Sequence, residues 1–437
     1  MRINFKGKKV LVYGLGISGQ SACKLLHEKG ACVSVYDDEK RFGTFFPFVE
    51  NPLTKKYDFV VLSPGVKVLG NTIISHFILS RTKVLSELDL GWLFFEGKIV
   101  GITGTNGKTT TTSLVGEIFK AAGKETFVCG NIGLPFTSVV EGSGQDSFAI
   151  CEVSNLQLEL SSLFKADCSA ILNLAPDHID RHGCFEEYVR VKKKILHKKR
   201  QRHVLNFDDE MTRNCFLNKK TIFFSKNLLR KGVFVKNNAI YHNKTKVISL
   251  IDIPIFGEKN IENVMAAVAI ARSYKIKIDI IRKCIMHFKA PSHRLEYLGQ
   301  INGASVFDDS KATNISSVIG AIESLGQRGL VLLLGGQNKG FKFDGIFNKG
   351  FVFENLLCFG QAGQEIAGCA TEYGYQPIVF STMKEAAQFA KAEAKDGQKI
   401  LLSPACASFD EFDSYAVRGR VFKEIMFEET EKLEFQG

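Results

Sequence analysis

The stretch GITGTNGKTTTTS, residues 101–113, indicates a phosphate-binding loop between a strand and a helix. Apolar residues precede it, and the residues after it, through GEIFKAAG, have the pattern of a helix. The common form of such loops, G-x-x-x-x-G-K-[ST], would place a glycine at position 102. Ile102 stands there, and the glycines fall at 101, 104 and 107. The stretch is therefore a variant, and a turn without a ligand is the alternative interpretation.

The side chains of this loop supply what a nucleoside triphosphate requires. Gly104 and Gly107 allow the backbone to approach phosphate oxygens at the start of a helix. Lys108 can span the β- and γ-phosphates, and Thr109 can offer its hydroxyl to Mg²⁺. We therefore predict ATP binding, with contacts from Gly104, Thr105, Asn106, Gly107, Lys108, Thr109 and Thr110.

The bulk composition describes a globular protein of several domains. A chain of 437 residues suggests about two to four domains. No apolar run reaches the roughly 18 residues that a membrane helix needs. Eleven cysteines without C-x-x-C pairs favour reduced thiols over a disulfide framework. We expect a cytoplasmic location, no signal peptide and no membrane partner.

The net charge of +11 has two explanations, nucleic-acid or membrane binding and acidic small-molecule substrates. The densest basic run is VRVKKKILHKKRQR, residues 189–202, and it lacks interleaved aromatic residues. This run has the pattern of a solvated helix face. We therefore expect no nucleic-acid partner.

The N-terminal segment has the pattern of a Rossmann-like start. A strand over residues 8–13 leads into GLGISG, with glycines at 14, 16 and 19 and an acid, Asp37, about twenty residues on. The phosphate loop at 101 leaves no room for a second half. We therefore predict a truncated domain that holds a mononucleotide, and a plain strand–helix turn is the alternative.

The remaining sequence alternates strand and helix patterns, which predicts parallel, doubly wound sheets throughout. The fold class is α/β with three domains. We expect a truncated Rossmann-like domain at 1–92, a central P-loop ATPase domain at 93–290 and a Rossmann-like domain at 291–437.

Two segments of the central domain carry candidate metal ligands. Glu152 ends a strand, where a carboxylate can bind Mg²⁺ opposite Thr109, and a salt-bridged acid is the alternative. APDHIDRHG offers His178, Asp180 and His182 at alternate positions, which is compatible with a zinc cluster or with solvated loop side chains. Of these, His178 is the best placed to approach a metal.

In the last domain, four polar segments follow strands or lie in turns: HRLE (293–296), FDDSKATN (307–314), LLLGGQNKG (332–340) and LLSPACASFDEF (401–412). Arg294 can bind a phosphate or carboxylate with two hydrogen bonds. As a set, these segments predict a pocket for an anionic substrate.

Together the motifs resemble the Mur ligases of bacterial peptidoglycan synthesis, over essentially the whole chain. The resemblance rests on GITGTNGKTTTTS, GNIG (130–133), NLAPDHIDRHG, GEKNIENVMAA, HRLE, DDSKATN and LLSPACAS. GTNGKT is shared with folylpolyglutamate synthases, whereas DDSKATN and SPACASFDEF are typical of the D-glutamate-adding members.

The resemblance implies an ATP-dependent amide ligase. Its expected substrates are UDP-N-acetylmuramoyl-L-alanine, D-glutamate and ATP, with Mg²⁺ at two sites, and the enzyme is expected to be a monomer. ATP would phosphorylate the substrate carboxylate, and the amine of D-glutamate would attack the acyl phosphate.

The resemblance also assigns roles to residues. One Mg²⁺ would be bound by Thr109 and Glu152, and a second by His178 and a carbamylated lysine. In the family this lysine lies four residues after a tyrosine and three before an aliphatic residue. Tyr188 and Ile195 therefore select Lys192. The expected catalytic residues are Lys108, Lys192, His178 and Glu152. Further ATP contacts would be Asn260, Arg294, Asp309 and Lys311. The expected substrate contacts are Gly14, Gly16, Ser18, Asp37, Ser63, Gly65, Asn131, Lys339, Ser408 and Tyr415.

Two other functions remain as alternatives. One is a folylpolyglutamate synthase-like ligase, which the first domain and DDSKATN oppose. The other is a nucleotide-dependent binding protein that uses the basic run as a nucleic-acid contact.

Overall fold

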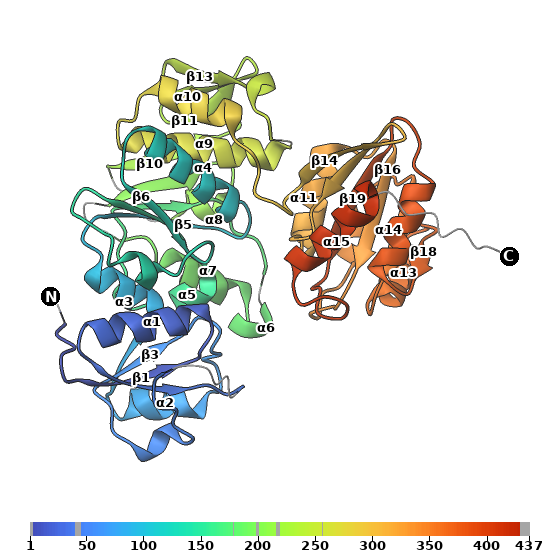
Figure 1. The fold of residues 1–437 in the computed structure, drawn as a ribbon. Helices are drawn as coiled ribbons and strands as arrows, with labels where there is room; N and C mark the ends of the chain where they lie inside the picture. Colours follow the sequence, from blue (N-terminus) through green and yellow to red (C-terminus); the bar gives the residue numbers. More distant parts are fainter. Residues whose placement is uncertain are drawn as a thin grey trace. The chain divides into compact units, whose positions relative to one another are not determined.

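A computed structural model describes residues 3–39, 45–177, 179–197, 201–215, 219–255 and 257–428. The chain packs into two compact units. The first contains Met1–Pro254 and Ile261–Phe288, and the second contains Ile255–Asn260 and Lys289–Gly437. The described residues form three sheets, two in the first unit and one in the second (Figure 1).

The first sheet is parallel throughout, as the sequence predicts. Its strands are β1 (Lys9–Tyr13), β2 (Cys32–Tyr36), β3 (Phe59–Leu62) and β4 (Lys83–Ser86), in the order β2-β1-β3-β4. Its helical segments are α1 (Ile17–Glu28), η1 (Pro52–Thr54) and α2 (Thr72–Leu79). Helices α1 and α2 cover opposite faces (Figure 1), so Val10 packs with α1 and Leu11 with α2. Both faces of the strands are therefore apolar, as expected for a doubly wound sheet.

The second sheet carries the phosphate loop. Its strands are β5 (Lys98–Thr103), β6 (Thr126–Gly130), β7 (Phe148–Glu152), β8 (Cys168–Ile171), β9 (Arg202–Asn206), β10 (Thr221–Ser225), β11 (Val233–Lys236), β12 (Ala239–His242) and β13 (Thr245–Ser249). They run in the order β13-β12-β11-β10-β9-β8-β5-β7-β6. Strand β5 lies between β7 and β8, so the loop that follows it is flanked by the carboxyl ends of two neighbours.

Helices of different length connect these strands and complete the first unit. They are α3 (Glu87–Phe94), α4 (Lys108–Ala121), η2 (Phe136–Val139), α5 (Asn155–Leu160), α6 (Ile179–His182), α7 (Phe185–Lys193), α8 (Glu210–Arg213), η3 (Leu250–Asp252), α9 (Glu258–Ser273) and α10 (Ile278–His287). Helix α3 begins with a capping box between Ser86 and Asp89. Asp89 also accepts hydrogen bonds from the backbone of 162–164, so it ties α3 to the second sheet.

The third sheet forms the core of the second unit. Its strands are β14 (Glu296–Ile301), β15 (Ala304–Asp308), β16 (Leu330–Gly335), β17 (Asn355–Phe359), β18 (Ile378–Phe380) and β19 (Lys399–Ala405), in the order β14-β15-β19-β16-β17-β18. Its helices are α11 (Ile315–Leu325), α12 (Asp344–Phe347), α13 (Gly363–Glu372), α14 (Met383–Ala392) and α15 (Tyr415–Phe427). Side chains of α11, α12 and α13 pack on one face, and those of α14 and α15 on the other.

The predicted α/β fold with three domains is confirmed, but the prediction of parallel sheets throughout is wrong in two places. Strands β11, β12 and β13 form an antiparallel meander at one edge of the second sheet. Strand β14 pairs antiparallel with β15 at the edge of the third sheet. Each pair is joined by a tight turn with left-handed asparagines, such as Asn237 and Asn302, and such a turn can only connect antiparallel strands.

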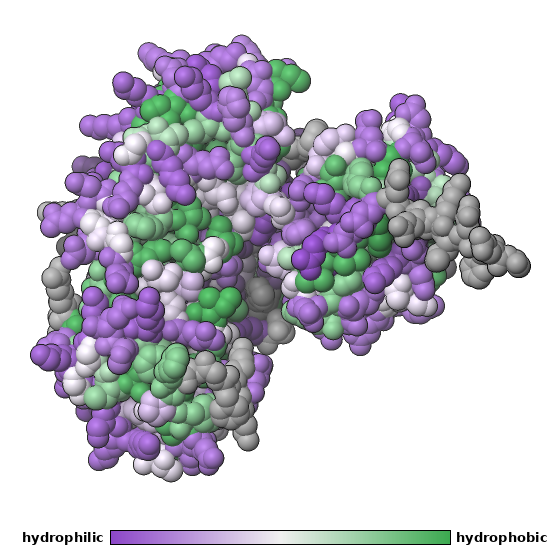
Figure 2. Space-filling model, viewed as in Figure 1, coloured by the Kyte–Doolittle hydropathy of each residue, from purple (hydrophilic) through white to green (hydrophobic). Residues whose placement is uncertain are grey.

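Hydrophilic residues predominate on the face shown in Figure 2, and apolar residues form separate patches there. Among the described residues, no helix combines the length and the apolar composition required to cross a membrane. All eleven cysteines are free thiols.

Candidate active site

The phosphate loop leaves β5 and enters α4 through two glycines with positive φ. Gly104 has φ 159° and Gly107, the N-cap of α4, has φ 81°. A β-carbon at Gly107 would overlap the side-chain amide of Asn263 on α9. Gly101, by contrast, lies within β5, where its missing side chain makes room for Ile195 and Ala166. The three evenly spaced glycines therefore have different roles. Gly101 permits close packing within the sheet, and only Gly104 and Gly107 determine the conformation of the loop.

A second loop, after β8, holds the phosphate loop in place. The backbone amide of Asn106 donates to Asn173 Oδ1 at 2.8 Å, and the amide of Thr105 donates to the Asn173 carbonyl at 3.0 Å. The hydroxyl of Thr105 also donates to the carbonyl of Ala175 and lies 3.0 Å from the Tyr188 hydroxyl. These bonds fix the conformation of the loop. No role was predicted for Asn173 or Asn263, although both stand in the quoted motifs.

Thr109, Glu152 and Asn131 are predicted from three separate motifs, and the structure brings them together. Thr109 Oγ1 donates to Glu152 Oε2 at 2.7 Å, and Asn131 Nδ2 donates to Glu152 Oε1 at 2.7 Å. Glu152 is buried at the end of β7, and the Asn131 amide also donates to its carbonyl. A hydroxyl and a carboxylate are oxygen ligands of the kind that Mg²⁺ prefers. The donor set at Thr109 and Glu152 therefore fits a magnesium ion.

Lys192 lies on α7 with its amine buried against the phosphate loop. Its Nζ donates to the Gly104 carbonyl at 2.9 Å and lies 4.9 Å from the centre of the Tyr188 ring. Burial lowers the pKa of Lys192 well below its usual value, and the positive charge of Lys108 lowers it further. The prediction that residues 189–202 form a solvated helix face is therefore wrong at Lys192, because the apolar side of α7 carries this lysine inward. Its neighbours Lys193 and Lys194 are partly exposed.

Lys108, at the start of α4, donates through Nζ to the carbonyls of Gly104 at 2.9 Å and Thr105 at 2.7 Å. Thr110, two residues further along the same helix, is buried.

The predicted ligand His178 lies outside the described residues, as does the side chain of Asp180. His182 is buried, and its Nε2 lies 2.8 Å from Asn155 Nδ2. The imidazole of His182 therefore contacts the side-chain amide of Asn155 within the first unit.

At the first sheet, the predicted fingerprint turn is closely packed. Gly14 has φ 93°, and a β-carbon there would overlap Ser63, while a β-carbon at Gly19 would overlap the Gly14 carbonyl. Asp37 is buried and accepts hydrogen bonds from the amides of Leu15 at 2.6 Å and Glu39 at 2.9 Å. Its carboxylate therefore closes the glycine turn. Gly16 and Ser18 lie at the start of α1, and Gly65 is exposed.

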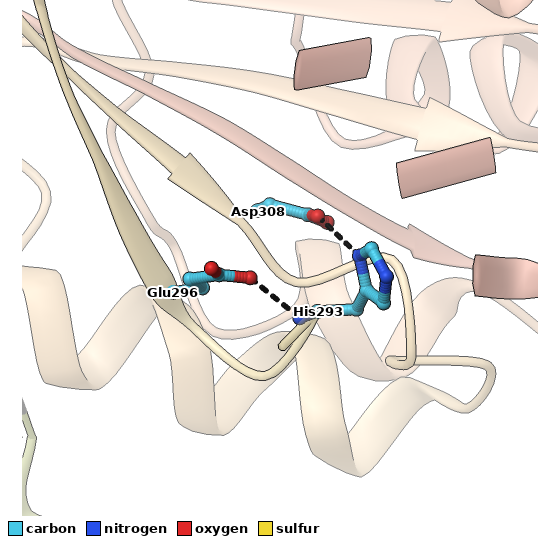
Figure 3. Close-up of side chains that lie close together, drawn as sticks. All are labelled: His293, Glu296 and Asp308. Carbon is cyan, nitrogen blue, oxygen red and sulfur yellow. Dashed lines mark hydrogen bonds and ion pairs between the residues drawn. The ribbon is translucent and has the colours of Figure 1, made fainter. Parts of the chain in front are cut away.

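In the second unit, Arg294 stands between two residues with left-handed backbone, His293 at φ 64° and Leu295 at φ 48°. Figure 3 shows the contacts that hold this turn: His293 Nδ1 lies 2.6 Å from Asp308 Oδ2, and the His293 amide donates to Glu296 Oε2 at 2.9 Å. The hydrogen bond with Asp308 raises the pKa of His293. Left-handed conformations of non-glycine residues are costly, so the surrounding contacts must enforce this turn.

The predicted residues Asp309, Lys311 and Tyr415 lie close to this turn. Burial raises the pKa of Asp309 to about 7, and Asp309 accepts hydrogen bonds from Ser403 Oγ and the Leu295 amide. Lys311 Nζ lies 3.6 Å from the centre of the Tyr415 ring. The structure therefore brings these three predicted residues to one region of the third sheet.

Ser408 lies after β19, and Lys339 lies after β16. The Ser408 hydroxyl is buried, and among the described residues it has no hydrogen-bond partner. Arg418, to which the sequence analysis gave no role, is fully buried and donates to Ser310 and to the carbonyls of Cys406 and Ala407. It holds the segment before Ser408 in place. Lys339 is exposed, and Asn260 is half-buried in the first turn of α9.

A phosphate loop that opens a helix, an acidic residue at the end of the adjacent strand and two lysine amines on the loop define an enzyme of the P-loop nucleotide-binding class. The chain belongs to the Mur ligase family. Its residues 102–271 match the Mur ligase middle domain, and residues 293–406 match the Mur ligase glutamate ligase domain.

Curated relatives match over nearly their full length. The UDP-N-acetylmuramoylalanine–D-glutamate ligase of Thermoanaerobacter sp. (strain X514) is 38% identical, covering 98% of this chain and 99% of the relative. The ligase of the same name from Clostridioides difficile (strain 630) is 37% identical, covering 97% of this chain and 99% of the relative.

Solved structures share the fold at lower identity. The MurF ligase of Thermotoga maritima in complex with ADP has a TM-score of 0.60 at 18% identity, over 96% of this chain and 94% of that chain. A pseudomurein peptide ligase type C from Methanothermus fervidus has a TM-score of 0.62 at 19% identity, over 96% and 99%.

Proposed function

We propose that this enzyme joins D-glutamate to the carboxylate of UDP-N-acetylmuramoyl-L-alanine, using ATP, in the cytoplasm and as a monomer. The observation that carries the proposal is the arrangement around the phosphate loop, where Lys108 donates to the Gly104 carbonyl and Thr109 donates to Glu152. The choice of substrates is supported by the near full-length similarity to relatives that bear the name of this D-glutamate ligase.

Residues 1–92 are proposed to bind the UDP-sugar substrate. The turn at Gly14 and Gly16 presents the start of α1, and backbone amides there suit a diphosphate. Asp37 contributes by closing this turn, because its carboxylate already accepts two backbone amides. Ser18, Ser63 and Gly65 would complete the site. Asn131 would contact the muramoyl part while it holds Glu152.

The first chemical step is transfer of the γ-phosphoryl group of ATP to the substrate carboxylate. Lys108 would neutralise charge that develops on the transferring group, since its amine is held over the loop by two carbonyls. Thr109 and Glu152 would hold a magnesium ion, with His178 and Lys192 as proposed ligands of a second one. When bound, these ions would neutralise phosphate charge.

For Lys192 we propose carbamylation. A neutral amine attacks CO₂, forms the N–C bond and releases a proton, which leaves an anionic carbamate. Burial and Lys108 both lower the pKa of Lys192, so they favour the neutral amine that this reaction needs. Once formed, the carbamate would place a negative charge near the amine of Lys108, which donates to the same Gly104 carbonyl.

The second step is amide formation. The amine of D-glutamate would attack the acyl phosphate, and inorganic phosphate would leave as the C–N bond forms. Lys339, Ser408 and Tyr415 of the third sheet are proposed contacts of D-glutamate. The buried and unpartnered hydroxyl of Ser408 supports this assignment, because buried polar groups usually find a partner. Asn260, Arg294, Asp309 and Lys311 are proposed for ATP.

The test is a reconstitution with purified enzyme, ATP, Mg²⁺, UDP-N-acetylmuramoyl-L-alanine and either D- or L-glutamate. The proposal predicts ADP release that requires both other substrates, and a product whose mass equals their condensation product. ATP turnover that is unaffected by leaving out either substrate would contradict it.

A further inference from the structure

Arg181 is a largely buried arginine that joins the two sheets of the first unit. It lies on α6, directly after the loop that follows β8, and its side chain is 12% exposed. Its Nε donates to Glu159 Oε2 at 2.8 Å, and its Nη2 donates to the carbonyl of Val66 at 2.9 Å. Val66 belongs to the turn after β3, so this arginine touches the carboxyl-terminal side of both sheets.

These two hydrogen bonds leave donors of the guanidinium unused. The Nη1 amino group of Arg181 has no acceptor in the part of the chain that the structure describes. Glu159 compensates the charge from one side only. A mostly buried arginine with a free edge is a group that suits a planar or tetrahedral anion, such as a carboxylate or a phosphate.

The surroundings leave space for such a ligand. Gly65 precedes Val66, and a β-carbon at Gly65 would meet nothing within 4 Å. The turn itself is fixed, since the Val66 amide donates to the Ser63 carbonyl at 3.1 Å. On the other side, the contact of His182 with Asn155 fixes the end of α6. Arg181 is therefore held rigidly beside an open stretch of backbone.

Ligands of parallel α/β sheets bind at the carboxyl ends of the strands. Arg181 bridges these ends for β3 and β8, and Ser63 and Gly65 beside it are proposed contacts of the UDP-sugar. We propose that Arg181 is a further substrate-binding residue, which binds an anionic group of this substrate through the unused edge of its guanidinium. This inference rests on the proposed function and adds a residue that the sequence analysis did not select.

The test is titration calorimetry of the intact enzyme with uridine, UDP and UDP-N-acetylmuramoyl-L-alanine. The main variant is Arg181→Met, which keeps an apolar stem and removes all donors. Loss of a charge-assisted hydrogen bond predicts a roughly 10- to 100-fold weaker Kd for the ligand that carries the anion, with uridine unchanged within about threefold. Weaker UDP binding would identify the diphosphate as the anion. A loss confined to the full substrate would identify its carboxylate.

Three further variants separate binding from a structural role. Glu159→Gln removes the carboxylate charge that pairs with Arg181 and leaves the guanidinium in place. It should preserve the ratio of the UDP and uridine affinities. Arg181→Lys should show an intermediate loss, since it keeps the charge without the guanidinium edge. Arg190→Met is the matched control, because Arg190 is exposed on α7 and pairs with Glu187 of the same helix.

Two results would overturn the inference. One is an Arg181→Met enzyme that binds all three ligands as the wild type does. The other is an equal loss for uridine and UDP that Glu159→Gln reproduces, which would show that the arginine only holds α6. A wild-type enzyme that binds neither UDP nor the full substrate would contradict the proposed function itself, and this inference with it.

Discussion

The side-chain amines of Lys108 and Lys192 donate to the same acceptor, the carbonyl oxygen of Gly104, each at 2.9 Å. Two ammonium groups on one carbonyl repel each other, and Lys192 is the more deeply buried of the two. Of the two, Lys192 is therefore the lysine whose ammonium form is disfavoured, because burial and the charge of Lys108 lower its pKa. This division matches the roles proposed for them, a cation for the phosphoryl group and a nucleophile for CO₂.

Lys108→Ala removes the charge that is aimed at the transferring phosphoryl group. Loss of one electrostatic donor of this kind costs roughly 10²–10³ in kcat. Steady-state ADP release measures the effect. Lys120→Ala is the matched control, because Lys120 is exposed near the end of the same helix, and it should retain wild-type turnover. A Lys108→Ala enzyme with normal kcat would place the phosphate site elsewhere.

Lys192→Ala should be nearly inactive, and added acetate should partly restore its turnover by supplying a carboxylate where the carbamate would lie. Lys193→Ala is the neighbouring control, and we expect it to be active because Lys193 is partly exposed. An inactive Lys193→Ala enzyme beside an active Lys192→Ala enzyme would show that the wrong lysine was selected.

Glu87 is fully buried at the start of α3 and bonds through only one oxygen. Its Oε1 accepts hydrogen bonds from the amide and hydroxyl of Thr137, whereas Oε2 has no partner among the described residues. Burial raises the pKa of Glu87 above its ordinary value. Folding is therefore favoured at low pH by proton binding, and this contribution is lost as pH rises from the unfolded pKa, about 4.3, through the folded pKa.

Glu87→Gln cannot titrate and keeps an acceptor for Thr137. We expect it to unfold at higher urea concentration than the wild type at pH 8, with a gain on the order of 1 kcal/mol that shrinks toward pH 4. Thr137→Val, which removes the hydroxyl, should be destabilised at both pH values. If Glu87→Gln were less stable at pH 8, the buried carboxylate would have to be ionised and stabilising.

The His293–Asp308 pair should make the stability of the second unit depend on pH. The pKa of His293 is raised by its hydrogen bond with Asp308, so the stabilisation is complete below the unfolded value of about 6.5. It is lost as pH rises through the raised folded pKa. The difference in Tm between wild type and His293→Gln should therefore shrink as the pH rises above the unfolded pKa of about 6.5. His287→Gln, at an exposed position, is the control, and a constant difference for His293→Gln would refute the charged pair.

Much of the fold and part of the site follow from local patterns. The strand, glycine loop and helix around residue 104 are determined by neighbours in sequence, and Thr109 and Glu152 were predicted because parallel strands place their ends together. The antiparallel meander of β11–β13 was missed, since its strands are short and lie at an edge of the sheet. Asn173 and Asn263 are positioned by tertiary contacts, which no spacing reveals. Lys192 was selected from the basic run only through the resemblance, and the packing of α7 is what shows that its side chain is buried.

In the proposed reaction, the phosphoryl group of ATP goes to the carboxylate of the UDP-sugar substrate. The most direct measurement uses UDP-N-acetylmuramoyl-L-alanine labelled with ¹⁸O in its carboxylate, with mass analysis of the inorganic phosphate released. Phosphorylation of the carboxylate predicts that its ¹⁸O appears in the phosphate, because phosphate leaves the acyl phosphate with that oxygen when the amine attacks. Unlabelled phosphate from this substrate, with ¹⁸O entering only from labelled water, would contradict the account.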